Sequence, residues 1–278
     1  MIPRPVTSVR AVKVRPTHHT ELPEHVATEE PMQILVAGPG QDAGPLAVTM
    51  RTPGHDFELA AGFVVTEGVV APEDLASVDY CEAVDDLVPE ARYNHVSVRL
   101  KRDWSAVPRY FTASASCGMC GKTSIDQIET SCPAVAYGTP IPSVLIPTLP
   151  DRLRPAQTAF DRTGGLHAAG LFSPAGELVC AREDVGRHNA VDKVVGHLVL
   201  HRPGPVPADL VLAVSGRVSF EIVQKAAMAG IGTIAAVSAP SSLAVTAADR
   251  LGVTLAAFVR GGTYNVYSHP GRIDFRNE

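Results

Sequence analysis

Apolar and polar residues alternate with a period of two in three segments of the first hundred residues. The apolar positions are Met32, Ile34 and Val36, then Leu46, Val48 and Met50, then Val96, Val98 and Leu100. This period is typical of strands with one buried face, so the sequence predicts three strands. After the second strand, the turn residues 53–56 precede a predicted helix that ends near Gly68. Residues 1–110 are therefore predicted to form a small mixed α+β part.

The next stretch of the chain shows neither the apolar period of a strand nor that of a helix. Between residues 102 and 155 it contains seven prolines, which are Pro108, Pro133, Pro140, Pro142, Pro147, Pro150 and Pro155. A long segment without regular structure inside a compact protein usually serves a function or connects domains. Because Cys117 and Cys120 lie in it, residues 111–155 are predicted to form a cysteine-bearing loop and a proline-rich connection.

The last part of the chain, residues 156–278, has a different pattern of apolar and polar residues. Residues 167–172 and 178–182 flank a Ser-Pro-Ala-Gly turn, which predicts a hairpin. Almost continuously apolar segments then alternate with segments of helical spacing. The apolar segments are 210–214, 231–237 and 253–259, and the helical ones are 189–201, 220–229 and 243–251. This alternation is typical of a sheet buried on both faces. The predicted fold class is α/β, with a mostly parallel, three-layer C-terminal domain.

Composition excludes several classes of protein. The 278 residues include 24 lysines and arginines against 29 aspartates and glutamates, a formal net charge of −5, and 45% of the residues are hydrophobic. Such a chain is not disordered, and without a lysine cluster it is not expected to bind nucleic acid generally. The first residues lack the apolar core of a signal peptide, and glycines and a proline interrupt the longest uncharged run, residues 226–248. We expect a cytoplasmic protein without a membrane segment.

Three turns follow the predicted strands of the last part, at residues 215–219, 238–242 and 260–263. The carboxyl ends of parallel strands meet at one edge of a sheet, where ligands bind. The first two turns lead into helices, whose free N–H groups favour anions, and the third combines Arg260 with two glycines. Together they predict a site for a nucleotide or another phosphorylated ligand. Each turn alone is equally typical of a loop that merely connects a strand to the next element of an α/β fold.

Residues 183–193 hold seven polar functional side chains in eleven positions at the start of a predicted helix. A solvated helix start capped near Asn189 explains some of them. It does not explain why Arg187 and His188 stand together, so lining of a site is an equal alternative. Arg187 and Arg217 are weaker candidates than Arg260 for an anion contact.

The five cysteines are an odd number and too widely spaced for a disulfide framework. Cys117 and Cys120 form the one close pair, in Cys-Gly-Met-Cys-Gly, and spacing leaves three interpretations open. One is a structural zinc site, for which Cys132 would supply only a third ligand. Another is a redox pair, which would need a preceding strand, and the last is a reactive thiol that carries sulfur. Cys81, Cys132 and Cys180 are predicted to be ordinary core or surface residues.

Six motifs, in order between about residue 50 and residue 272, match a known family. They are residues 62–68, 116–121, 163–169, 183–196 and 215–217, and residues 258–263 with 267–270. The cysteine motif alone is weakly specific, but together with residues 183–196 it is strongly specific. On these motifs the chain resembles the FdhD/NarQ family of formate dehydrogenase accessory sulfurtransferases. The first 45 or so residues lie outside the clear match.

The resemblance implies a sulfur carrier, or sulfurtransferase, that takes sulfur from a cysteine desulfurase as a cysteine persulfide. It implies that the sulfur passes to the molybdenum bis(guanine dinucleotide) cofactor, bound as a substrate, before this cofactor enters apo formate dehydrogenase. By motif position the persulfide falls on Cys117, with Cys120 as an auxiliary thiol. The cofactor-binding stretch falls on Phe258, Val259, Arg260, Gly261, Gly262 and Thr263.

The resemblance also implies a homodimer and a C-terminal domain similar to the cytidine deaminase fold. Residues 167–169 read His-Ala-Ala where a zinc deaminase has H-x-E, so the fold is expected without the deaminase chemistry. No permanent metal, nucleic acid or membrane is expected to bind. Two alternatives remain, a chaperone that delivers the cofactor without essential thiol chemistry and a thiolate zinc protein.

Overall fold

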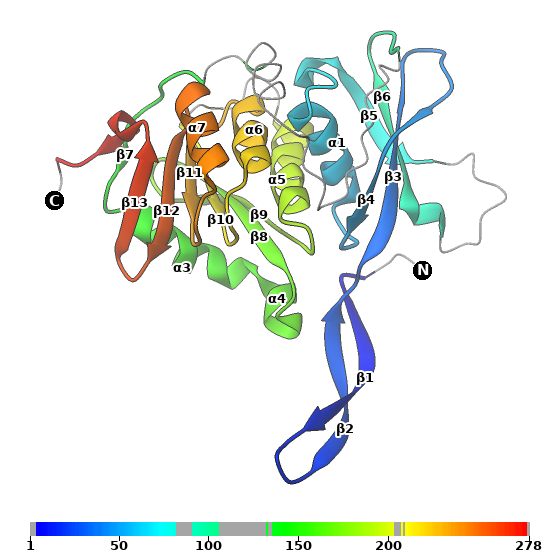
Figure 1. The fold of residues 1–278 in the computed structure, drawn as a ribbon. Coiled ribbons are helices and arrows are strands. Elements are labelled where there is room, and N and C mark those ends of the chain that lie inside the picture. The colour runs from blue at the N-terminus through cyan, green and yellow to red at the C-terminus, as the bar shows by residue number, and fades with distance from the viewer. Residues whose placement is uncertain are drawn as a thin grey trace.

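Two β-sheets, one of four strands and one of six, organise the chain. The computed structural model describes residues 4–81, 91–105, 132, 135–202, 207 and 209–276. Helices α1 (Asp56–Thr66) and α5 (Arg187–His201) lie side by side between the two sheets (Figure 1). No helix of the described part is both long and apolar enough to cross a membrane.

The four-stranded sheet has the order β4-β3-β6-β5, and α1 packs on one face of it. Its strands are β3 (Glu30–Ala37), β4 (Gly44–Arg51), β5 (Leu75–Tyr80) and β6 (His95–Leu100). Single-turn helices η1 (Pro72–Asp74) and η2 (Ala91–Asn94) lead into β5 and β6. The three predicted strands are confirmed as β3, β4 and β6, and the predicted helix as α1. β5 was not predicted from the sequence.

A long hairpin of β1 (Val6–Val14) and β2 (His19–Ala27) precedes this sheet. It extends away from both sheets and contacts the short helix α4 (Thr158–Thr163) (Figure 1). Most side chains of the two strands are exposed. Neither strand was predicted from the sequence, because a ribbon without a buried face has no alternation of apolar and polar residues that reports burial.

The six-stranded sheet has the order β13-β12-β11-β10-β8-β9. Its strands are β8 (His167–Phe172), β9 (Leu178–Asp184), β10 (Val211–Val214), β11 (Thr233–Ala236), β12 (Thr254–Arg260) and β13 (Thr263–Ser268). The predicted hairpin and the three apolar strands are confirmed. β10, β11 and β12 are parallel, whereas the other strand pairs are antiparallel. The expected mostly parallel arrangement holds only for these three central strands, because a hairpin at each edge turns the chain back.

Helices cover both faces of the six-stranded sheet, as its apolar strands predict. On one face lie α5, α6 (Phe220–Met228) and α7 (Ser242–Arg250), and on the other lie η3 (Ile146–Thr148), α3 (Leu149–Leu153) and η4 (Arg154–Ala156). Beside them β7 (Ile141–Pro142) pairs with β14 (Ile273–Asp274), which follows η5 (Pro270–Arg272). The expectation of a connection without regular structure is therefore wrong for residues 141–155, because Ile146 and Leu149 are fully buried there. The predicted domain boundaries remain a prediction.

The two halves meet where the backbones of α1 and α5 touch. A Cβ atom at Gly62 of α1 would lie 1.8 Å from the carbonyl oxygen of Asp192, and one at Gly196 of α5 would lie 1.8 Å from that of Glu58. Such distances are far inside van der Waals contact, so only glycine fits at either position. The pair of glycines sets how closely the two helices approach.

We expect Gly62→Ala to destabilise the chain by about 1–3 kcal/mol or more, because the new methyl group forces α1 and α5 apart. This loss is expected although alanine favours a helix interior by about 1 kcal/mol over glycine. Urea unfolding of the full chain measures it. Gly165→Ala is the control, since a Cβ there meets only atoms 3.9 Å away. Equal stability of the two variants would contradict the close crossing.

Candidate functional site

The three turns picked out by sequence lie together at the carboxyl edge of the parallel strands. Val218 N–H donates to the Ala239 carbonyl (3.1 Å), and Ser241 N–H donates to the Val218 carbonyl (2.9 Å). Phe258 N–H in turn lies 3.3 Å from the Ser238 carbonyl. In Figure 1 these turns lie at the lower edge of the six-stranded sheet. We call this edge, formed by residues 215–219, 238–242 and 258–263, the rim.

Residues 258–263 form the end of the β12–β13 hairpin. Gly261 and Gly262 have φ values of 58° and 77°, and Arg260 pairs with Thr263 across them. Two successive positive φ values are what a two-residue hairpin turn requires, so the turn itself accounts for both glycines. Phe258 also has a positive φ, 55°, at an irregularity in the β12–β13 register. The hairpin geometry therefore explains part of a pattern that sequence analysis interpreted as ligand contact.

The side chains of this stretch divide into buried and accessible ones. Val259 is fully buried in the core, so its side chain does not face the rim. Arg260 and Thr263 are exposed, and no atom lies within 4 Å of a Cβ built on Gly261 or Gly262. The guanidinium of Arg260 lies 5.6 Å from the centre of the Phe258 ring. Among the described residues no carboxylate lies within ion-pair distance of Arg260, which leaves it available to an anion.

A cationic corner, formed by Arg187 and Arg217 around the imidazole of His167, continues the rim toward β8. A Cβ at Gly216 would lie 3.2 Å from His167 Nδ1 and 3.9 Å from Arg187 Cβ, so these residues are close neighbours. Burial and then the charges of Arg187 and Arg217 lower the pKa of His167. Two guanidinium groups thus act on one imidazole, and among the described residues neither forms an ion pair with a carboxylate.

The start of α5 adds to the positive potential of this corner. Arg187 is the first residue of the helix, Gly186 before it offers no side-chain cap, and the first turn contains no acidic residue. A cation at a helix N-terminus is unfavourable unless an anion is near, because the helix dipole is positive there. Arg187 Nε is buried without a hydrogen-bond partner among the described residues. The corner is therefore suited to a phosphate group.

His188 lies beside the corner but does not add charge to it. Its Nε2 is 3.1 Å from the Ser219 hydroxyl, in the turn after β10. Burial, followed by the nearby charges of Arg187 and Lys225, lowers the pKa of His188 to about 4. His188 is therefore neutral at neutral pH and available for hydrogen bonding only.

Most other polar residues of the segment 183–193 hold the structure together. Asp184 accepts from Thr52 N–H (3.1 Å) and pairs with Lys193 (2.7 Å), and Asn189 donates to the Met50 carbonyl (2.8 Å). Glu183 accepts the N–H groups of residues 159 and 160 in α4. Arg187 and His188 lie beside the rim, next to Gly216 and Ser219, so for these two residues the lining of a site stays a prediction.

A buried ion pair continues these contacts along the α1–α5 crossing. Lys225 Nζ lies 2.9 Å from Asp192 and 2.6 Å from Glu67, and Asp192 accepts from the Thr66 hydroxyl at 2.6 Å. Burial alone would lower the pKa of Lys225, but the two carboxylates more than offset this and raise it. The lysine therefore stays charged and links α6 to both α1 and α5.

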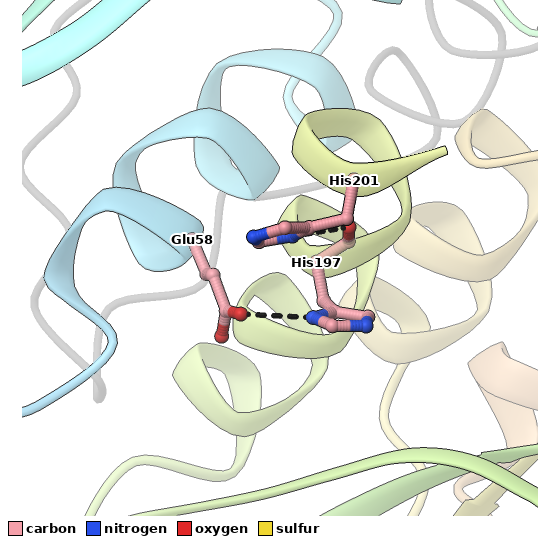
Figure 2. A group of neighbouring side chains, drawn as sticks. All are labelled: Glu58, His197 and His201. Atoms are coloured by element: carbon pink, nitrogen blue, oxygen red, sulfur yellow. Dashed lines mark hydrogen bonds and ion pairs between the residues drawn. The ribbon is translucent and has the colours of Figure 1, made fainter. Parts of the chain in front are cut away.

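Glu58 is the centre of a polar cluster that sequence analysis did not find. Its carboxylate pairs with Arg182, whose Nη2 lies 2.7 Å from Oε1, and with His197 Nδ1 at 2.9 Å. His201 stands one helical turn beyond His197, and the two rings stack (Figure 2). Burial would raise the pKa of Glu58, but hydrogen bonds from Arg182, His55 and His197 hold it well below its usual range.

The predicted thiols, Cys117 and Cys120, lie outside the described residues. Burial raises the pKa of Cys132 to about 11, whereas burial, opposed by the charge of Arg182, raises that of Cys180 to about 12. Both are therefore protonated and weakly nucleophilic at neutral pH. This agrees with the prediction that they are ordinary core residues.

Three comparisons with known proteins give concordant results. The model of the FdhD/NarQ family matches residues 27–274. The sulfur carrier protein FdhD of Streptomyces coelicolor is 46% identical over 275 residues, covering 96% of this chain and 95% of that protein. The protein of the same name in Mycobacterium tuberculosis is 48% identical, covering 90% and 92%. A crystal structure described as a formate dehydrogenase accessory protein from Desulfotalea psychrophila superposes with a TM-score of 0.74, at 27% identity over 97% of this chain and 99% of that one.

The low pKa of Glu58 predicts a pH dependence of stability. An unperturbed Glu has a pKa of 4.5, so the stabilisation by Glu58 is complete above about this pH and is lost as the pH falls through the depressed pKa of the folded state. Glu58→Gln should therefore lower the free energy of unfolding at pH 7, with a smaller deficit near pH 3. Exposed Glu177→Gln is the control. A Glu58→Gln deficit that does not change with pH would refute the ion-pair account.

Proposed function

Because the chain belongs to the FdhD/NarQ family, we propose that it is a sulfur carrier that acts in the maturation of formate dehydrogenase. The observation that carries this proposal is identity of 46–48% over at least nine tenths of the chain to proteins named sulfur carrier protein FdhD. The structural neighbour described as a formate dehydrogenase accessory protein supports the second half of the statement.

Cys117 carries the sulfur in this proposal, as a persulfide. Its thiolate attacks the outer sulfur of a persulfide on a cysteine desulfurase, a new S–S bond forms, and the desulfurase cysteine leaves as a thiolate. The transfer changes no overall oxidation state. Two of the other cysteines, Cys132 and Cys180, are buried with raised pKa values, which supports assigning the chemistry to the glycine-flanked pair.

Cys120 provides a route for release. Its thiolate attacks Cys117 Sγ, a disulfide forms between the two residues, and the outer sulfur leaves as sulfide for the acceptor. A thiol reductant then restores both cysteines before the next cycle. Because a reduced pair is needed, we propose a cytoplasmic location.

The acceptor in this proposal is the molybdenum bis(guanine dinucleotide) cofactor, bound as a substrate at the rim. Arg260 and the accessible face beside Phe258 would hold one end of a guanine nucleotide. The cationic corner, about two to three strand spacings of 4.8 Å away, would hold phosphate. Among the described residues Arg260, Arg187 and Arg217 have no ion-pair partner, which supports their availability to the anionic groups of the nucleotide.

The larger sheet is proposed to resemble the cytidine deaminase fold. Parallel strands β10, β11 and β12 with helices α6 and α7 support a cytidine-deaminase-like arrangement of the larger sheet. The partners proposed are a cysteine desulfurase, apo formate dehydrogenase and a second copy of this chain in a homodimer.

Cys117→Ala is expected to abolish sulfur loading. The chain is incubated with a cysteine desulfurase and cysteine labelled with radioactive sulfur, and the label bound to it is counted after non-reducing gel filtration. Cys81→Ala is the matched control and should load like the parent. Undiminished label on Cys117→Ala would exclude Cys117 as the carrier.

Arg217→Ala and Arg260→Ala are each expected to weaken GDP binding about tenfold or more, because a hydrogen bond to a charged group contributes about 1.5–3 kcal/mol. Isothermal titration calorimetry with GDP measures the dissociation constant. Arg99→Ala, an exposed arginine of the smaller sheet, is the control. Unchanged affinity in either rim variant would remove that residue from the binding site.

A further inference from the structure

A second group of ligand-type side chains lies far from the rim, at the other end of α5. His197 and His201 occupy one face of its last turns, and Glu58 faces them from α1 (Figure 2). One nitrogen of each histidine and one carboxylate oxygen all lie within 4.8 Å of one another. At 1.5 Å per residue, His201 is about 20 Å along the helix from Arg187, so this group is separate from the proposed nucleotide site.

We propose that Glu58, His197 and His201 bind one divalent transition-metal ion of the Zn²⁺ and Ni²⁺ class. Two imidazole nitrogens and one carboxylate oxygen are a donor set that these ions prefer over Mg²⁺ or Ca²⁺, which require mostly oxygen ligands. Histidines four residues apart on a helix project from the same face, so both can reach one ion.

The geometry of the crossing preorganises the three ligands. Gly196 packs against the backbone of Glu58, so the carboxylate stands beside His197 as a direct result of the helix contact. His201 Nδ1 lies 3.1 Å from the His197 carbonyl and donates to it, which leaves the lone pair of its Nε2 for the ion. Nδ1 of His197 lies 2.9 Å from Glu58 Oε1, and the ion takes the place of the proton between them, so that His197 then carries its proton on Nε2. The negative end of the α5 dipole favours a cation at this end of the helix.

Arg182 limits the affinity of this site. Its Nη2 lies 2.7 Å from Glu58 Oε1 and 3.2 Å from His197 Nδ1, so its charge opposes a bound cation. Each carboxylate oxygen has two lone pairs, so Glu58 can bind the ion while it remains paired with the guanidinium. We therefore expect an exchangeable ion that bridges α1 and α5, whose affinity increases when the charge of Arg182 is removed.

The test uses the full chain in a Cys117→Ser, Cys120→Ser background, so that thiolates do not bind the metal. Calorimetric titration with Zn²⁺ should give one ion per chain. His201→Ala should weaken binding by roughly 10–100-fold or more, the range that loss of even an outer partner of a metal ligand causes. The exposed His25→Ala is the matched control and should bind like the parent background. No binding by the parent background, or equal binding by His201→Ala, would overturn the proposal.

Two further readouts separate metal binding from a merely structural role of the cluster. Zn²⁺ should raise the melting temperature of the parent background but not that of His201→Ala, because only the folded state with the full ligand set binds the ion. Since His201 is exposed, its removal is not expected to prevent folding. Arg182→Gln should tighten Zn²⁺ binding. A melting temperature unchanged by Zn²⁺, or weaker binding in Arg182→Gln, would contradict the site.

Discussion

The crossing of α1 and α5 is the contact on which the rest of the structure depends. Gly62 and Gly196 let two helix backbones touch, and the buried Lys225–Asp192 pair fixes the same junction by charge. A buried ion pair is costly when one partner is missing, so it favours one arrangement of these helices over others. The junction joins the four-stranded and six-stranded sheets into one body. It also fixes α5, whose first residue lies at the rim.

In the part of the chain that the structure describes, charged side chains are paired in the interior of this protein but not at the rim. In the interior, Asp184 pairs with Lys193 and Glu58 with Arg182, so carboxylates and cations satisfy one another. At the rim the balance differs, because Arg217 and Arg260 have no carboxylate partner among the described residues. A chain with a net charge of −5 can thus bind an anionic ligand through a local positive edge, without a positive field over the whole molecule.

The sequence predicted those parts of the fold that leave a periodic burial pattern. Strand β3, with Met32 and Ile34 facing the core, was predictable, whereas the exposed β1–β2 hairpin was not. The rim turns were predictable because turn residues follow apolar strands. The presence of Gly261 and Gly262, however, is explained by the two-residue turn of the β12–β13 hairpin and needs no ligand. The contacts of Asp184 with Thr52 and of Glu58 with Arg182 join residues more than 120 positions apart in sequence, which no local pattern reveals.

We propose that the carboxyl edge of β10, β11 and β12 holds the guanine nucleotide of the substrate, and a crystal structure of the full chain with GDP would test this. We expect phosphates within hydrogen-bond distance of the cationic corner, with the nucleotide extending toward Arg260. A nucleotide bound elsewhere, such as on the four-stranded sheet, would contradict it.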